Sequence, residues 1–143
     1  GCHWPFRRTE AAQWPRLLAL LLEGRPVKAR DAVGWIADFV GPLDEALQVA
    51  WAVATGGEHG LERRKVVDES IEGITEAMPL LGAAGDPKIE EARKAILDTV
   101  QAACGVSLAE ALEIQAKHSG AFMTSTACRE GVIGVACRKI TVV

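Results

Sequence analysis

A run of leucines between Arg16 and Leu22 constrains the fold of this chain more than any other feature. Pro15 precedes the run, and proline suits the first turn of a helix because the N–H groups there have no intrahelical partner. Gly24 follows it, at the position where helices commonly end. A helix that is apolar on most of its sides is stable only when it is buried. The run therefore predicts a buried helix.

Two further stretches place apolar residues at helical spacing. The first follows Pro42 and is ended by Gly56-Gly57, and its apolar face consists of Leu43, Leu47, Ala50, Trp51 and Ala54. The second follows Asp86-Pro87 and is ended by Gly105, and its stripe consists of Ile89, Ala92, Ile96, Val100 and Ala103. Asp86 is a suitable N-cap for this helix, because its carboxylate can accept a backbone N–H of the first turn.

The last part of the chain predicts two more helices. Ser107 and Glu110 have the spacing of a capping box, in which each side chain accepts a backbone N–H at the helix start. We expect this helix to pass His118 and to bury Leu108, Leu112 and Phe122. A final helix is expected from Ser125 or Thr126 to about Arg138-Lys139.

The remaining segments are harder to interpret. Residues 1–13 are expected to be irregular, and residues 35–40 (Trp-Ile-Ala-Asp-Phe-Val) have the pattern of a short strand. Val67, Ile71, Ile74 and Met78 keep helical spacing, but Gly73 opposes a helix there. Residues 79–87 are expected to form a loop. The whole pattern predicts a mainly α fold with at most one or two short strands.

Composition excludes several classes of protein. The chain is 49% hydrophobic and 24% charged, which argues against disorder. A net charge of -3 gives no overall attraction to nucleic acid or to anionic membranes. No apolar run approaches the roughly 18 residues of a membrane span, and no signal-peptide pattern opens the chain. The four cysteines form no CxxC pair, so we expect reduced thiols in a cytoplasmic protein and no metal site.

No side chain has the sequence context of a catalytic group. The chain lacks a GxGxxG turn, a P-loop, a GxSxG elbow and an HExxH helix. Glu130 and Asp31 are expected to stabilise helix starts rather than to transfer protons. Cys128 has no general base at a spacing that the sequence reveals, and His118 has no nucleophile at such a spacing. We therefore assign no catalytic residue.

Two segments together resemble a known family. Residues 17–36 run from the leucines through Gly24-Arg25-Pro26-Val27 to Gly34, and residues 126–132 contain Glu130-Gly131-Val132. The first is similar to a leucine-rich helix followed by "TGRPIxAxEA", a glycine and a short strand, and the second to "TxDxxEGv". Both patterns belong to the crotonase (enoyl-CoA hydratase/isomerase) superfamily, and residues 108–117 resemble the helix that precedes the second.

The resemblance divides the chain into three parts. Residues 1–57 resemble the middle of a crotonase, residues 58–87 contain an insertion of about 25 residues, and residues 88–143 resemble its C-terminal helices. The chain departs from the pattern in two places. Thr126 or Ala127 stands where the family has an acid, and Val135 stands where it has an aromatic residue.

The resemblance implies that the chain is the helical C-terminal part of a crotonase-like α/β fold. In that family the N-terminal half holds the oxyanion-hole donors and the catalytic acids, and residues 1–12 resemble the stretch just after the second glutamate. We then expect the chain to contribute helices that cover CoA and contacts of a homo-oligomer, a trimer or hexamer, and to be inactive without its N-terminal half. CoA would enter as part of an acyl-CoA substrate, with no separate cofactor. The residues expected near its phosphates are Arg25, Lys28, Arg138 and Lys139.

Two alternatives stay open at this point. Six basic residues lie between positions 7 and 30, and they form either a positive rim for CoA phosphates or an ordinary solvated surface; they are Arg7, Arg8, Arg16, Arg25, Lys28 and Arg30. The chain as a whole is either part of a CoA-thioester enzyme or a stand-alone helical binding or assembly module without catalysis.

Overall fold

The computed structural model describes residues 2–24, 26–61, 65–74, 76, 82 and 84–131. Its regular elements are the 3-10 turns η1 (Trp4–Arg7) and η2 (Ala11–Gln13), and the helices α1 (Trp14–Glu23), α2 (Ala29–Ala32), α3 (Leu43–Thr55), α4 (Pro87–Ala102) and α5 (Leu108–Met123). Residues 126–131 are also helical. The predicted mainly α class is confirmed. Within the described part, no helix is long and apolar enough to cross a membrane.

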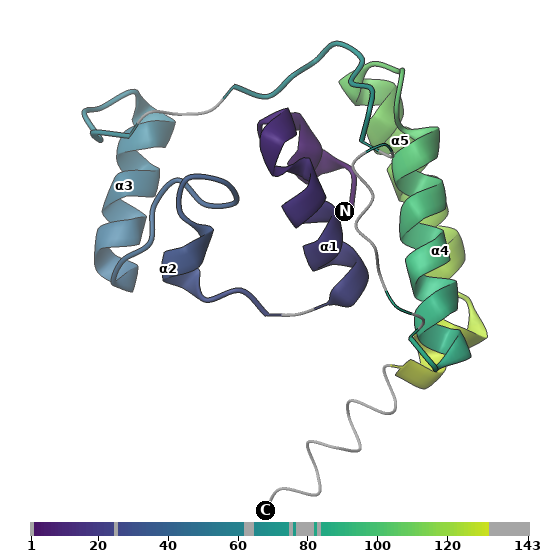
Figure 1. Cartoon of the computed structure of the whole chain (residues 1–143). Helices are drawn as coiled ribbons and strands as arrows, with labels where there is room; N and C mark the ends of the chain where they lie inside the picture. Colours follow the sequence, from purple (N-terminus) through teal and green to yellow (C-terminus); the bar gives the residue numbers. More distant parts are fainter. Residues whose placement is uncertain are drawn as a thin grey trace, which may run out of the picture.

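α1, α4 and α5 form a packed group, and α2 and α3 lie to one side of it (Figure 1). α4 and α5 lie side by side as a hairpin, and α1 packs against α4. These are the extensive contacts between α-helices in the described part, and α3 takes part in none of them. In Figure 1, α3 lies on the far side of α1 and α2 from the hairpin.

The leucine run forms α1, as predicted. Gly24 ends the helix at φ 62°, a left-handed conformation that only glycine adopts without strain, and its N–H donates to the Leu20 carbonyl at 3.0 Å. Leu17, Leu18 and Leu22 are buried. The expectation that this helix lies in the core is therefore confirmed.

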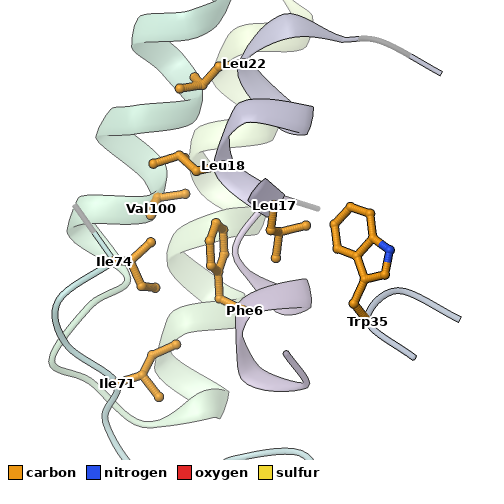
Figure 2. Packing of buried hydrophobic residues seen from close by; sticks show 8 residues of the cluster. All are labelled: Phe6, Leu17, Leu18, Leu22, Trp35, Ile71, Ile74 and Val100. Carbon is orange, nitrogen blue, oxygen red and sulfur yellow. The ribbon is translucent and has the colours of Figure 1, made fainter. Parts of the chain in front are cut away.

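The core forms where α1 meets α4 and three segments without α-helix (Figure 2). Phe6, in η1, is 1% exposed, and it points toward Leu17 and Ile74. Leu18 lies beside Val100 of α4. The opening segment, expected to be irregular, thus forms two 3-10 turns and contributes a fully buried aromatic side chain to the core.

Two predicted helix caps are present. The Asp86 carboxylate accepts the Lys88 N–H at 2.9 Å, and the Ser107 hydroxyl accepts the Glu110 N–H at 3.4 Å. The burial predicted for α5 is wrong in part, because Leu112 is 38% exposed and Ala111 is the buried residue of this helix. α5 packs closely on α4, and a close helix–helix contact favours a small side chain at its centre.

The strand predicted at residues 35–40 is wrong. Only an isolated bridge joins Val33 and Ala37, and residues 34–36 form a turn. The Trp35 indole folds back toward the preceding helices: its Nε1–H donates to the Asp31 carbonyl at 2.6 Å, and the Arg16 guanidinium lies 4.0 Å from the ring centroid. Trp35 is the buried residue of this run, whereas Ile36 and Val40 are exposed, and no strand of the described part lies beside it.

Residues 65–74 contain no helix either, despite their helical spacing. The segment is held instead by hydrogen bonds to distant backbone: Val67 N–H to the Arg7 carbonyl at 2.9 Å, Leu108 N–H to the Asp68 carbonyl at 2.9 Å, and Gly105 N–H to the Ile71 carbonyl at 3.1 Å. Ile74, at 0% exposure, reaches the core from this non-helical segment. Met78, the last residue of the spacing pattern, lies outside the described residues.

Candidate functional site

Of the four residues predicted to contact CoA, the structure places one. Lys28 is exposed and occupies the N-cap position of α2. Arg25, Arg138 and Lys139 lie outside the described residues. The predicted cluster therefore remains a prediction.

The other basic residues of the predicted rim have structural partners. Arg8 forms an ion pair with Asp38, Arg16 lies over the Trp35 ring, and the Arg30 Nε lies 3.9 Å from the Asp31 carboxylate. Arg7 is 0% exposed and cannot belong to any surface rim. The idea of a continuous positive rim over positions 7–30 is wrong for Arg7, because its side chain points into the protein.

Arg7 is the centre of a buried hydrogen-bond cluster. One guanidinium nitrogen donates to the Glu69 carbonyl at 2.5 Å, with longer contacts to the carbonyls of Val67 and Asp68, and the other donates to the Val106 carbonyl at 2.8 Å. Burial lowers the pKa of this guanidinium. A buried cation held by these carbonyls fixes the opening segment to residues 67–69 and to the loop between α4 and α5, and this is a structural role.

His3 completes the cluster. The Arg7 Nε–H donates to His3 Nε2 at 3.0 Å, so this nitrogen carries no proton and the imidazole is neutral with its proton on Nδ1. Nδ1 is buried and has no hydrogen-bond partner among the described residues. Burial, and secondarily the charge of Arg7, lowers the pKa of His3 to about 4. The ring therefore accepts a hydrogen bond from Arg7 and stays unprotonated at neutral pH.

A surface groove of about 370 Å³ lies between α4 and α5. Its volume falls in the range of small-molecule sites. Its lining combines two lysines, a histidine and two carboxylates with an apolar floor; the lining residues are Glu91, Lys94, Ala95, Asp98, Lys117, His118, Ala121, Phe122 and Ser125. Within the lining, Lys94 Nζ is 2.5 Å from Asp98.

One hydrogen bond orients the histidine of this groove. The Thr99 hydroxyl donates its single proton to the Ala95 carbonyl at 2.6 Å, and its oxygen lies 3.2 Å from His118 Nδ1. This contact is favourable when Nδ1–H donates to Thr99, which assigns the proton to Nδ1. His118 Nε2 is then the nitrogen available to a ligand.

The remaining polar groups near the groove are engaged in structure. The Ser125 hydroxyl accepts the Cys128 N–H at 3.1 Å and so caps the helical turn at residues 126–131. Lys88 Nζ lies 2.6 Å from the Glu130 carboxylate, which raises the pKa of Lys88 and links the start of α4 to this turn. Glu130 thus forms an ion pair between two helices, which is a different contact from the helix-start role expected from the sequence.

The thiols near this region are not activated. Burial raises the pKa of the Cys2 thiol, and it raises the pKa of the Cys104 thiol as well. In the described part of the chain, no three His, Cys, Asp or Glu side chains gather as they would around a metal ion. The groove offers charged and apolar groups for binding.

Sequence reasoning singled out His118 but missed the groove around it. Lys94, Asp98 and Lys117 lie on the polar sides of their helices, and only the packing of α4 on α5 brings them together. The chain matches no family model, no curated protein and no solved structure.

Proposed function

We propose that this chain is part of a CoA-thioester enzyme of the enoyl-CoA hydratase/isomerase type, in which it contributes CoA-covering helices and oligomer contacts rather than the catalytic acids. The observation that carries the proposal is the order of elements over residues 14–37. The resemblance implies a leucine-rich helix, a glycine, a short helix, a second glycine and a short strand. The chain has the first parts of this order, namely α1, Gly24 at φ 62°, α2 and Gly34 at φ 86°. It lacks the strand, because Val33 and Ala37 form only an isolated bridge.

The chemistry of the groove is consistent with this role. CoA carries several phosphate charges beside an apolar acyl arm. Because Lys94 is paired with Asp98, Lys117 supplies the cation of the groove and the Phe122 ring supplies apolar surface. Lys28, which the resemblance assigns to CoA, lies at the start of α2 and outside that groove. The CoA phosphates would lie near Lys28 in one case and in the groove in the other, and one substitution tests each location.

The test is CoA binding by titration calorimetry, together with an assay for crotonyl-CoA hydration. The proposal predicts saturable binding of CoA to the chain and no hydration above background. Lys28→Gln should weaken binding about three- to tenfold if the resemblance locates the phosphates, and Lys117→Gln should do so if the groove holds them. Lys65→Gln, at an exposed position outside both places, is the matched control and should leave the affinity unchanged. Absence of binding at millimolar CoA would refute the proposal.

A second function is favoured by a separate observation. No residue of α3 is buried, and its apolar face is exposed. Such a face is expected of a helical binding or assembly module, because an exposed apolar patch generally has a partner. A purified natural protein of mass near 15.2 kDa, without CoA binding or turnover, would favour this module over the enzyme.

A further inference from the structure

The apolar face of α3 is the most prominent exposed surface feature of the described chain. Leu43 is 76% exposed, Leu47 61% and Trp51 73%, and the three are four residues apart on one side of the helix. Exposing three such side chains on one side of a helix is unfavourable, since burying each of them would lower the free energy. The face therefore has the character of an interface.

Charge does not protect this face from association. Asp44 and Glu45, both in the first turn, are the only charged residues of α3. From Leu47 to Thr55 the helix carries no charge, and an uncharged apolar helix face packs readily against another helix.

The seam of α3 has the spacing of a helix-pairing surface. Leu43, Leu47, Ala50 and Ala54 are separated by four, three and four residues, which is the alternation of the two core positions in a heptad. The two large residues are in the N-terminal half and the two small ones in the C-terminal half. Trp51 borders the seam.

This division by size specifies the direction of pairing. In a parallel pair, leucine would meet leucine at one end and alanine would meet alanine at the other, so the two halves of the seam would require different interhelical distances. In an antiparallel pair, Leu43 meets Ala54 of the other helix and Leu47 meets Ala50. One register satisfies both layers, because the two residues of each layer lie at equal distances from the middle of the seam.

The acidic residues favour the same direction. A parallel pair would gather four carboxylates, two copies each of Asp44 and Glu45, at one end. In the antiparallel register, Asp44 and Glu45 of one helix lie about 12 Å along the axis from those of the other, because they stand opposite positions 53 and 52. This separation still exceeds the Debye length of about 8 Å in physiological salt.

We propose that the α3 face binds the α3 face of a second copy of this chain, antiparallel about a two-fold axis, with Leu43 against Ala54 and Leu47 against Ala50. Such an interface is isologous, so each copy presents the same patch and the assembly closes as a dimer. The inference uses no property of CoA, and a failure of CoA binding would leave it unaffected.

The first test is sedimentation velocity of the chain over a concentration series. We expect the mass to rise from 15.2 kDa to twice that value at concentrations on the order of tens of micromolar. Leu47→Glu should weaken the dimer by about 100-fold or more, because it places two like charges in the centre of the seam. Met123→Glu, at a site of 69% exposure on α5, is the matched control and should leave the dimer intact. A chain that stays monomeric to about 0.5 mM, or a dimer that Leu47→Glu leaves intact, overturns the proposal.

The second test addresses the register. Leu47→Ala should weaken the dimer about tenfold because it removes a side chain that packs in the seam. Ala50→Leu should weaken it because the new side chain crowds Leu47 of the other copy. The double variant Leu47→Ala/Ala50→Leu exchanges the two residues of the layer and should recover the affinity to within about threefold of the original. Far-UV circular dichroism checks that the helices are retained. If the double variant is weaker than both single variants, the antiparallel register is wrong.

Discussion

α1 and α3 have similar sequence patterns but different environments. Both are short helices rich in leucine and alanine, and each ends at a glycine in the left-handed conformation, Gly24 at φ 62° and Gly56 at φ 73°. α1 buries three leucines against α4 and the opening turn, whereas α3 buries no residue. Local sequence therefore determines whether a helix forms. Whether its apolar face is buried depends on contacts with the rest of the chain or with another chain.

The buried Arg7 cluster explains part of this difference. It attaches the segment before α1 to residues 67–69 and to Val106, and so holds α1 against the hairpin. The structure has no comparable buried side chain in α3. The two regions should therefore respond differently to substitution.

The largest effect is expected at Arg7. Arg7→Met leaves several buried carbonyls without a donor and should lower the free energy of unfolding by about 3–4 kcal/mol. Arg30→Met, at an exposed position, should change it by less than about 0.5 kcal/mol. Urea unfolding followed by circular dichroism measures both. Similar small effects of the two substitutions would show that the cluster does not hold the fold.

Matched leucine truncations compare α1 with α3 directly. Leu18→Ala should lower the free energy of unfolding by about 2.5–4 kcal/mol, because Leu18 is 0% exposed and its removal leaves a cavity. Leu47→Ala, measured at concentrations where the chain is monomeric, should change it by less than about 0.5 kcal/mol. Thermal and urea unfolding check these values. A large effect of Leu47→Ala in the monomer would mean that α3 packs within its own chain.

His3 should make the α1 region sensitive to acid. Its pKa is lowered from 6.5 to about 4 in the folded chain, so the unfolded chain binds a proton first as the pH falls. The contribution of the neutral His3 side chain to the free energy of unfolding is present above pH 6.5 and is lost as the pH falls toward 4. Between pH 7 and pH 4.5 this loss amounts to about 2 kcal/mol.

The measurement is the difference in unfolding free energy between the two pH values. His3→Gln should reduce the loss by about 2 kcal/mol, since an amide oxygen can still accept from Arg7 but does not titrate. His59→Gln is the histidine control and should retain the loss. An unchanged pH dependence in His3→Gln would contradict the assignment of a buried neutral imidazole.

The smallest effect is expected at the caps of the hairpin. Ser107→Ala removes the acceptor of the Glu110 N–H and should destabilise the chain by about 1 kcal/mol. Ser119→Ala, within α5, should be neutral or slightly stabilising because alanine is the better helix former. Equal unfolding midpoints for Ser107→Ala and the unmodified chain would indicate that this cap is not formed.

The features predicted correctly from the sequence are local ones. Asp86 and Ser107 act on backbone groups within three residues, and Gly24 ends a helix through its own φ, so each could be recognised without knowledge of the fold. The features missed are long-range. Arg7 was taken for a surface cation because nothing near it in the sequence reveals the carbonyls of residues 67–69 and 106.

Two other errors have the same origin. The pattern at residues 35–40 predicted a strand, but a strand is stable only when it pairs with a second strand. The Trp35 indole instead contacts the Arg16 guanidinium and donates to the Asp31 carbonyl. Ile74 kept helical spacing, although it reaches the core from a segment without helix. The groove was likewise beyond sequence reasoning, because it arises from the packing of α4 on α5.

Hydrogen exchange measured by mass spectrometry tests the central difference between α1 and α3 most directly. At concentrations where sedimentation shows a monomer, we predict that amides of α3 exchange at least about 100-fold faster than those of α1 and α4, because no buried contact opposes local opening of α3. Raising the concentration should slow exchange in α3 and leave α1 and α4 unchanged. Equal protection of α3 and α4 in the monomer would contradict the account.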